Sequence, residues 1–132
     1  MFDHERMEVY RLAVQFDILV AQIGPCRGHR SLKDQIDRAS VSIMACIAEG
    51  AGRRSPPDKR RFYGMARASA TECAVHLDAM KNRRLVTDDL VHNGRRLLLS
   101  IVRMLSRLSA PPTFPELEPA PDPSPIPLAR ID

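Results

Sequence analysis

Apolar residues recur at helical spacing in four stretches of the chain. In residues 5–24 they fall every three or four positions and form one stripe: Val9, Leu12, Ala13, Phe16, Leu19, Val20 and Ile23. A second, weaker stripe on the same segment contains Met7, Tyr10, Val14, Ile18 and Ala21. One stripe is enough to face the core of a bundle. The second favours contact with another subunit, or a wider buried face within the same subunit.

Residues 31–49 predict a second helix, with many small residues and with Ser31 as its N-cap. Ser55 predicts the N-cap of a third helix that continues to about residue 84, with Pro56 in its first turn. The buried face of this third helix repeats at spacings of four and three, which is typical of a coiled-coil seam. Its members are Phe62, Ala66, Ser69, Cys73, His76 and Met80.

A fourth helix is predicted from its N-cap, Thr87, to about residue 108. The composition then changes, because eight of the 11 prolines lie between Pro111 and Pro127. Proline blocks helix, so we expect residues 110–132 to form a disordered tail. Four amphipathic helices with short connections predict an all-α fold, an antiparallel up-down four-helix bundle over residues 1–109.

The charge of the chain is unevenly distributed. Residues 1–108 hold 19 lysines and arginines against 12 aspartates and glutamates, a net charge of +7. The rest of the chain holds Arg130 against four acids, a net charge of −3. A basic body suits an anionic partner such as nucleic acid, although a solvated basic surface is the alternative.

Several classes of protein are disfavoured by the composition. The chain has no run of about 18 apolar residues, and its N-terminus, MFDHERMEVYR, lacks the apolar segment of a signal peptide, so we expect a cytoplasmic protein without a membrane partner. The three cysteines include no CxxC pair, and no metal or cofactor is expected. Cys46 and Cys73 fall among apolar helical positions, where buried thiols are expected.

Catalysis is also disfavoured. Cys73 and His76 could meet on one helix face, but both lie on the predicted seam, which favours a core pair over a catalytic dyad. Glu49 and Glu72 could flank a metal, but the pattern around them does not predict a complete set of metal ligands. Ser69 is expected to bond a backbone carbonyl. We therefore expect that the protein is not an enzyme.

The corner between the second and third helices, IAEGAGRRSPPDKRRF, is rich in glycine and basic residues. It lacks the GxxxxGK[ST] pattern of a phosphate-binding loop, so Gly50 is expected to end the second helix in a left-handed conformation. The free N–H groups and dipole at the start of the third helix favour anions. The basic residues predicted here to contact a nucleic-acid backbone are Arg53, Arg54, Lys59, Arg60 and Arg61. A solvated turn is the alternative.

The string QIDRASVSIMACIAEGAGRRSPPDKRRFYGMARASATE resembles a family signature. The family comprises bacterial four-helix-bundle proteins related to those encoded within intervening sequences of 23S rRNA genes. It typically reads QI-R-A-x-S-I-x-x-N-I-A-E-G, then R-x-S, then F-x-x-x-A-R-x-S-x-x-E, and the resemblance extends over about residues 4–108. Cys46 departs from the pattern, because the family usually has asparagine there.

The resemblance implies a homo-oligomer, in the family a pentamer. It also implies kinship with the accessory variability protein of diversity-generating retroelements, which works beside a reverse transcriptase and is thought to contact nucleic acid. For the polar signature residues Arg38, Glu49, Arg67 and Glu72, we expect pairing between helices or across a subunit boundary. The alternative is that Arg38, Arg53 and Arg67 face a phosphate.

Two hypotheses for the function follow. The first is a non-catalytic homo-oligomeric bundle that binds RNA or DNA through its basic surfaces. The second is a protein-interaction scaffold without nucleic-acid binding, with the PPTFPELEPAPDPSPIP segment as a candidate for docking a partner. The sequence has no recognition-helix pattern and no RNA-binding aromatic pair, so it predicts no base preference.

Overall fold

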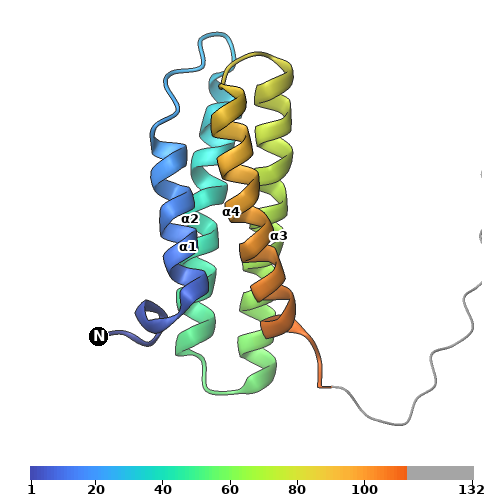
Figure 1. Cartoon of the computed structure of the whole chain (residues 1–132). Helices are drawn as coiled ribbons and strands as arrows, with labels where there is room; N and C mark the ends of the chain where they lie inside the picture. The colour runs from blue at the N-terminus through green and yellow to red at the C-terminus, as the bar shows by residue number, and fades with distance from the viewer. Residues whose placement is uncertain (113–132) are drawn as a thin grey trace, which may run out of the picture.

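A computed structural model of the chain describes residues 1–112. They form a short 3-10 helix, η1 (Asp3–Arg6), and four α-helices: α1 (Glu8–Ala21), α2 (Arg30–Gly52), α3 (Pro56–Asn82) and α4 (Asp88–Ser109). In Figure 1 the α1–α2 and α3–α4 connections lie at one end and the α2–α3 corner at the other, so successive helices run in opposite directions. The expected all-α four-helix bundle is therefore confirmed. The expected tail lies, from residue 113 on, outside the described residues.

The core lies between all four helices. α2 packs against α3, α3 against α4, and α1 against both α2 and α4, which closes the bundle. The largest fully buried side chains are Phe16, Ile36, Ile43, Ile47, Leu77, Met80, Ile101 and Leu105. Burial of each such side chain stabilises the fold by roughly 1.5–3 kcal/mol. No helix in the described part of the chain is both long and apolar enough to cross a membrane.

The two predicted apolar stripes of α1 differ in burial, and the main stripe is the more buried of the two. Its main stripe faces the core, and Val9, Ala13, Phe16 and Val20 are buried. The second stripe is more accessible, because Ile18 remains 55% exposed and Ala21 is exposed. Within one chain this second face is only partly covered, because Met7 and Tyr10 pack against the core.

Two of the three predicted N-caps are confirmed. The Ser55 side chain accepts a hydrogen bond from the backbone N–H of Asp58 at 3.2 Å, and Thr87 accepts one from Leu90 at 3.2 Å. The prediction for Ser31 is wrong, because α2 already begins at Arg30.

Gly50 does not end α2. The helix continues to Gly52, and Gly50 has no positive φ, so the expectation of a left-handed terminus at this position is wrong. Gly50 is buried, and a Cβ atom there would lie 2.8 Å from the Cε1 atom of Tyr63 on α3. The glycine is therefore required for a close approach of the Tyr63 ring to the backbone of α2.

α3 ends in a Schellman motif that the sequence did not predict. The backbone N–H of Leu85 donates to the carbonyl of Met80 at 2.9 Å, and that of Arg84 donates to Lys81 at 3.0 Å. Arg84 has a φ of 56°, the left-handed region that glycine usually occupies. The backbone at Arg84 is therefore strained, because its Cβ atom disfavours this conformation.

We expect Gly50→Ala to lower the free energy of unfolding by about 1–3 kcal/mol, because the added methyl overlaps the buried Tyr63 ring. Gly52→Ala is the matched control, since a Cβ there meets nothing within 4 Å. Urea denaturation at one fixed protein concentration measures both. Equal effects of the two variants would contradict the close-approach argument.

Arg84→Gly is expected to raise the free energy of unfolding by about 1 kcal/mol, because glycine adopts positive φ without a Cβ penalty. Arg83→Gly serves as the control, since Arg83 has a φ of −95° and no such strain to lose. A thermal unfolding series reports both changes. A gain in the Arg83 variant, or none in the Arg84 variant, would show that the strain is absent.

Candidate functional site

The α2–α3 corner gathers arginines around an aromatic ring. The guanidinium carbons of Arg53 and Arg61 each lie 4.6 Å from the centroid of the Phe62 ring. Arg53 also donates to the Glu49 carboxylate at 3.1 Å. Cation–π and ion-pair contacts of this kind hold a guanidinium in a defined place while its other N–H groups stay accessible.

Lys59 lies at the start of α3 as predicted, and its ammonium group has hydrogen-bond partners within the chain. Its Nζ donates to the carbonyl oxygens of Gly50 at 3.3 Å and Ala51 at 2.9 Å. These carbonyls belong to the last turn of α2, so Lys59 caps that helix from the first turn of α3. A lysine a few residues after the end of a helix could have indicated this capping role in the sequence.

Arg54 and Arg60 are the cations of the corner that remain available. Arg54 is exposed and Arg60 is half-buried, and within residues 1–112 neither has an ion-pair partner. Arg61 lies 3.9 Å from the Asp58 carboxylate, a weak surface pair. The corner as a whole carries more positive than negative charge.

The start of α3 offers fewer backbone donors than expected. Its first two residues, Pro56 and Pro57, have no N–H, and the N–H of Asp58 is taken by Ser55. The expectation of several free N–H groups there is therefore wrong, whereas contact between this corner and a phosphate stays a prediction. Arginine side chains supply the donors at this corner.

The signature residues do not pair with one another inside one chain. Glu49 contacts Arg53 on its own helix, and Glu72 contacts His76 at 3.2 Å, again on its own helix. Arg38 and Arg67 are exposed and have no ion-pair partner among the described residues. Pairing between helices of one chain is thus wrong, whereas pairing across a subunit boundary stays a prediction.

Ser69 links two helices instead of bonding a backbone carbonyl. Its hydroxyl shares a hydrogen bond with that of Ser42 on α2 at 2.9 Å, and Ser42 also lies 3.8 Å from the sulfur of Cys46. Cys46 is half-buried rather than buried. The expectation for Ser69 is wrong, because its hydroxyl bonds the hydroxyl of Ser42 on the neighbouring helix.

Cys73 is poorly suited to act as a nucleophile. The side chain is fully buried. Burial, with smaller contributions from the charges of Glu72 and Asp17, raises the pKa of its thiol to about 12. The thiolate is the reactive form, so this environment favours the core pair over the catalytic dyad. In the described part of the chain, no three His, Cys, Asp or Glu side chains are grouped so as to hold a metal ion.

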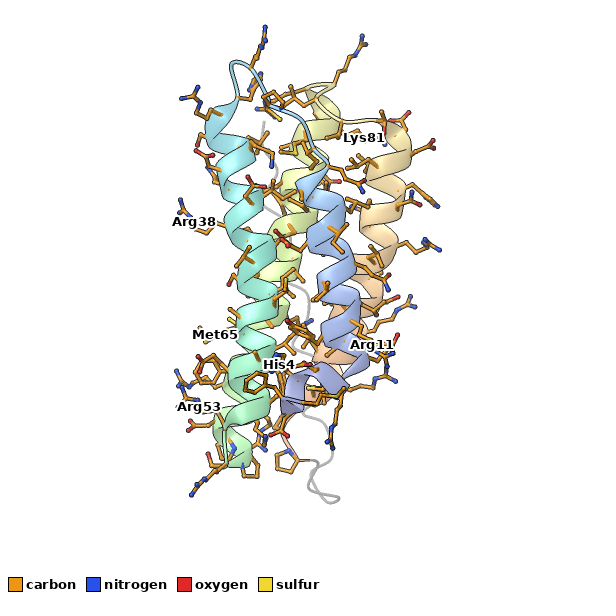
Figure 2. The ribbon with its side chains drawn as sticks, turned by 90° about the vertical axis from the view of Figure 1, so that its left-hand side faces the viewer. His4, Arg11, Arg38, Arg53, Met65 and Lys81 are labelled. Carbon is orange, nitrogen blue, oxygen red and sulfur yellow. The ribbon has the colours of Figure 1, made fainter. Side chains whose placement is uncertain are left out.

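A groove adjoins the corner and was not expected from the sequence. It has a volume of about 380 Å³ and is lined by Phe2, Asp3 and His4 near the N-terminus and by Ala48, Glu49, Gly52 and Arg53 of the α2 end. Figure 2 shows His4 and Arg53 at the same end of the bundle. Sequence reasoning missed the groove because its two walls are more than 40 residues apart in the chain.

The comparisons with known proteins agree with the helical architecture. The family model described as 23S rRNA-intervening sequence protein matches residues 5–107. That range includes the α2–α3 corner and nearly all of the four α-helices. Among curated proteins, none matches the chain.

Proposed function

The chain belongs to the 23S rRNA-intervening sequence protein family, and from this premise we propose that it is a non-catalytic, homo-oligomeric bundle that binds nucleic acid through the α2–α3 corner. The observation that carries the proposal is the pair Arg54 and Arg60, two cations without carboxylate partners within residues 1–112, beside two arginines held on Phe62. Guanidinium groups bind phosphate oxygens well because they present several N–H donors in one plane.

The charge balance supports an extended anionic ligand. Residues 49–61 contain five lysines and arginines against Glu49 and Asp58. The rest of the bundle adds further positive charge, so a nucleic acid is attracted from a distance as well as on contact. Contacts to phosphates alone carry no sequence information, which fits the lack of a recognition-helix pattern in the sequence.

Apolar side chains on the surface support the homo-oligomer. One large apolar residue on α1, one on α2, two on α3 and one on α4 are about half exposed: Ile18, Val41, Met65, Val75 and Leu99. Exposed apolar area of this kind is often buried between protein chains. The subunit number of five comes from the family resemblance, and we adopt it as part of the proposal.

A second candidate function is a protein-interaction scaffold without nucleic-acid binding. It is favoured by a groove of about 190 Å³ between α3 and α4, whose lining is mostly apolar and includes Ala74, Leu98, Leu99 and Val102. A partner helix or an extended apolar segment would fit such a surface. Family kinship suggests a reverse transcriptase as one such partner. Binding of nucleic acid separates the two candidates.

We expect the double variant Arg54→Ala, Arg60→Ala to bind labelled RNA and DNA on the order of tenfold more weakly than the original chain. The dependence of log affinity on log salt should also become shallower by about two, one for each lost phosphate contact. Fluorescence anisotropy over a range of salt concentrations measures both quantities.

The matched control is Arg27→Ala, Arg30→Ala. It removes the same charge from exposed positions near the α1–α2 connection, which lies at the opposite end of the bundle (Figure 1). If the two double variants weaken binding equally, the corner has no special role. If the unaltered protein does not bind at all, the scaffold function is the better explanation.

Sedimentation equilibrium is expected to give a mass that is a multiple of one chain. Leu99→Glu should reduce that mass, because it places a charge on the exposed apolar surface that includes the lining of the α3–α4 groove. Arg96→Glu, on the same helix at an exposed polar position, is the control and should leave the mass unchanged. A single-chain mass for the unaltered protein would contradict the homo-oligomer.

A further inference from the structure

The groove between the N-terminal segment and the end of α2 has a chemical character different from the basic corner beside it. Phe2 and His4 supply aromatic surface, and the small residues Ala48 and Gly52 leave the opposite wall open. Asp3, Glu49 and Arg53 supply charge. A ligand for this groove must combine flat apolar faces with polar edges.

Phe2 is an exposed aromatic ring that is held in place. Its side chain is 72% exposed, although its ring stacks on His4 with centroids 5.7 Å apart and planes 16° apart. His4 in turn meets Tyr10 edge-on at 4.6 Å, and the Phe2 N–H donates to Glu5 at 3.3 Å. A preorganised aromatic surface open to solvent is suited to stacking.

The charges decide which part of a nucleic acid fits the groove. Two carboxylates, Asp3 and Glu49, line it, and Glu49 is paired with Arg53, so the groove offers a phosphate no net positive charge. Arg54 and Arg60, the cations suited to phosphates, do not line this groove. The arrangement therefore separates a place for a base from a place for the backbone.

We propose that this groove binds an unpaired nucleobase of a single-stranded nucleic acid, stacked on Phe2 and next to the Arg53 guanidinium. The inference rests on the proposed function, because the strand that carries the base is held by the neighbouring arginines. It adds a preference for single strands over duplexes, since the faces of a paired base are stacked and its Watson–Crick edge is occupied.

The carboxylates also define a base preference. A carboxylate accepts hydrogen bonds and donates none, so its best partner is a base with an exocyclic amino group. Cytosine carries such a group, whereas uracil carries a carbonyl at the same ring position. The groove should therefore bind cytosine in preference to uracil.

Fluorescence anisotropy with the full chain tests the inference. The probes are ten-nucleotide oligocytidine and oligouridine RNAs, an abasic oligomer with the same number of phosphates, and a duplex RNA hairpin. A deoxycytidine oligomer separates DNA from RNA as the source of the base. The unaltered protein is expected to bind oligocytidine on the order of tenfold more tightly than the abasic oligomer. The affinity for oligouridine should lie between the affinities for oligocytidine and for the abasic oligomer.

Phe2→Ala should remove this difference, so that both oligomers bind with equal affinity and with an unchanged salt dependence. Phe2→Tyr, which keeps an aromatic ring, is the matched control and should preserve the difference. Equal binding of oligocytidine and the abasic oligomer by the unaltered protein would overturn the inference and leave the proposed function standing. Undiminished binding of oligocytidine by the Phe2→Ala variant would also overturn the inference and leave the proposed function standing. If no probe binds, the inference and the proposed function both fail.

Discussion

The close approach of α2 to α3 is the constraint on which the rest of the molecule depends. It requires a residue without a side chain at Gly50, because the Tyr63 ring occupies the space that a Cβ would take. It lets Lys59 reach the carbonyls at the end of α2 and cap that helix from the next one. The same approach brings Arg53 onto the Phe62 ring, so the contact that packs the core also arranges the charged surface.

Much of the fold was predictable from the sequence, because periodicity and capping are local properties. The apolar repeats identified the four helices, and the hydroxyls of Ser55 and Thr87 marked two of their starts. Gly50 was misinterpreted because glycine serves two purposes, positive φ and close packing, and a single sequence does not distinguish them. Arg84 was missed because nothing in its identity indicates a left-handed residue.

The candidate site was predictable in its charge but not in its geometry. The sequence identified all five basic residues of the corner. It could not assign Lys59 to a helix end. The lack of N–H donors at Pro56 and Pro57 could have been recognised from the sequence, because proline carries no backbone N–H. The groove beside the corner depends on a contact between the N-terminal segment and the end of α2, and long-range contacts of this kind leave no local pattern.

The hydroxyl link between Ser42 and Ser69 bears on which polar side chains the surrounding α2–α3 interface can accept. Either oxygen can act as the donor, and the partner at the next turn, Cys46, is a thiol that needs few hydrogen bonds. An asparagine amide in place of this thiol would bring several donors and acceptors that each need a partner once they are half-buried. With the thiol, the surrounding residues have fewer polar groups to satisfy. The Ser42–Ser69 bond across the α2–α3 interface therefore has no competing amide at the next turn.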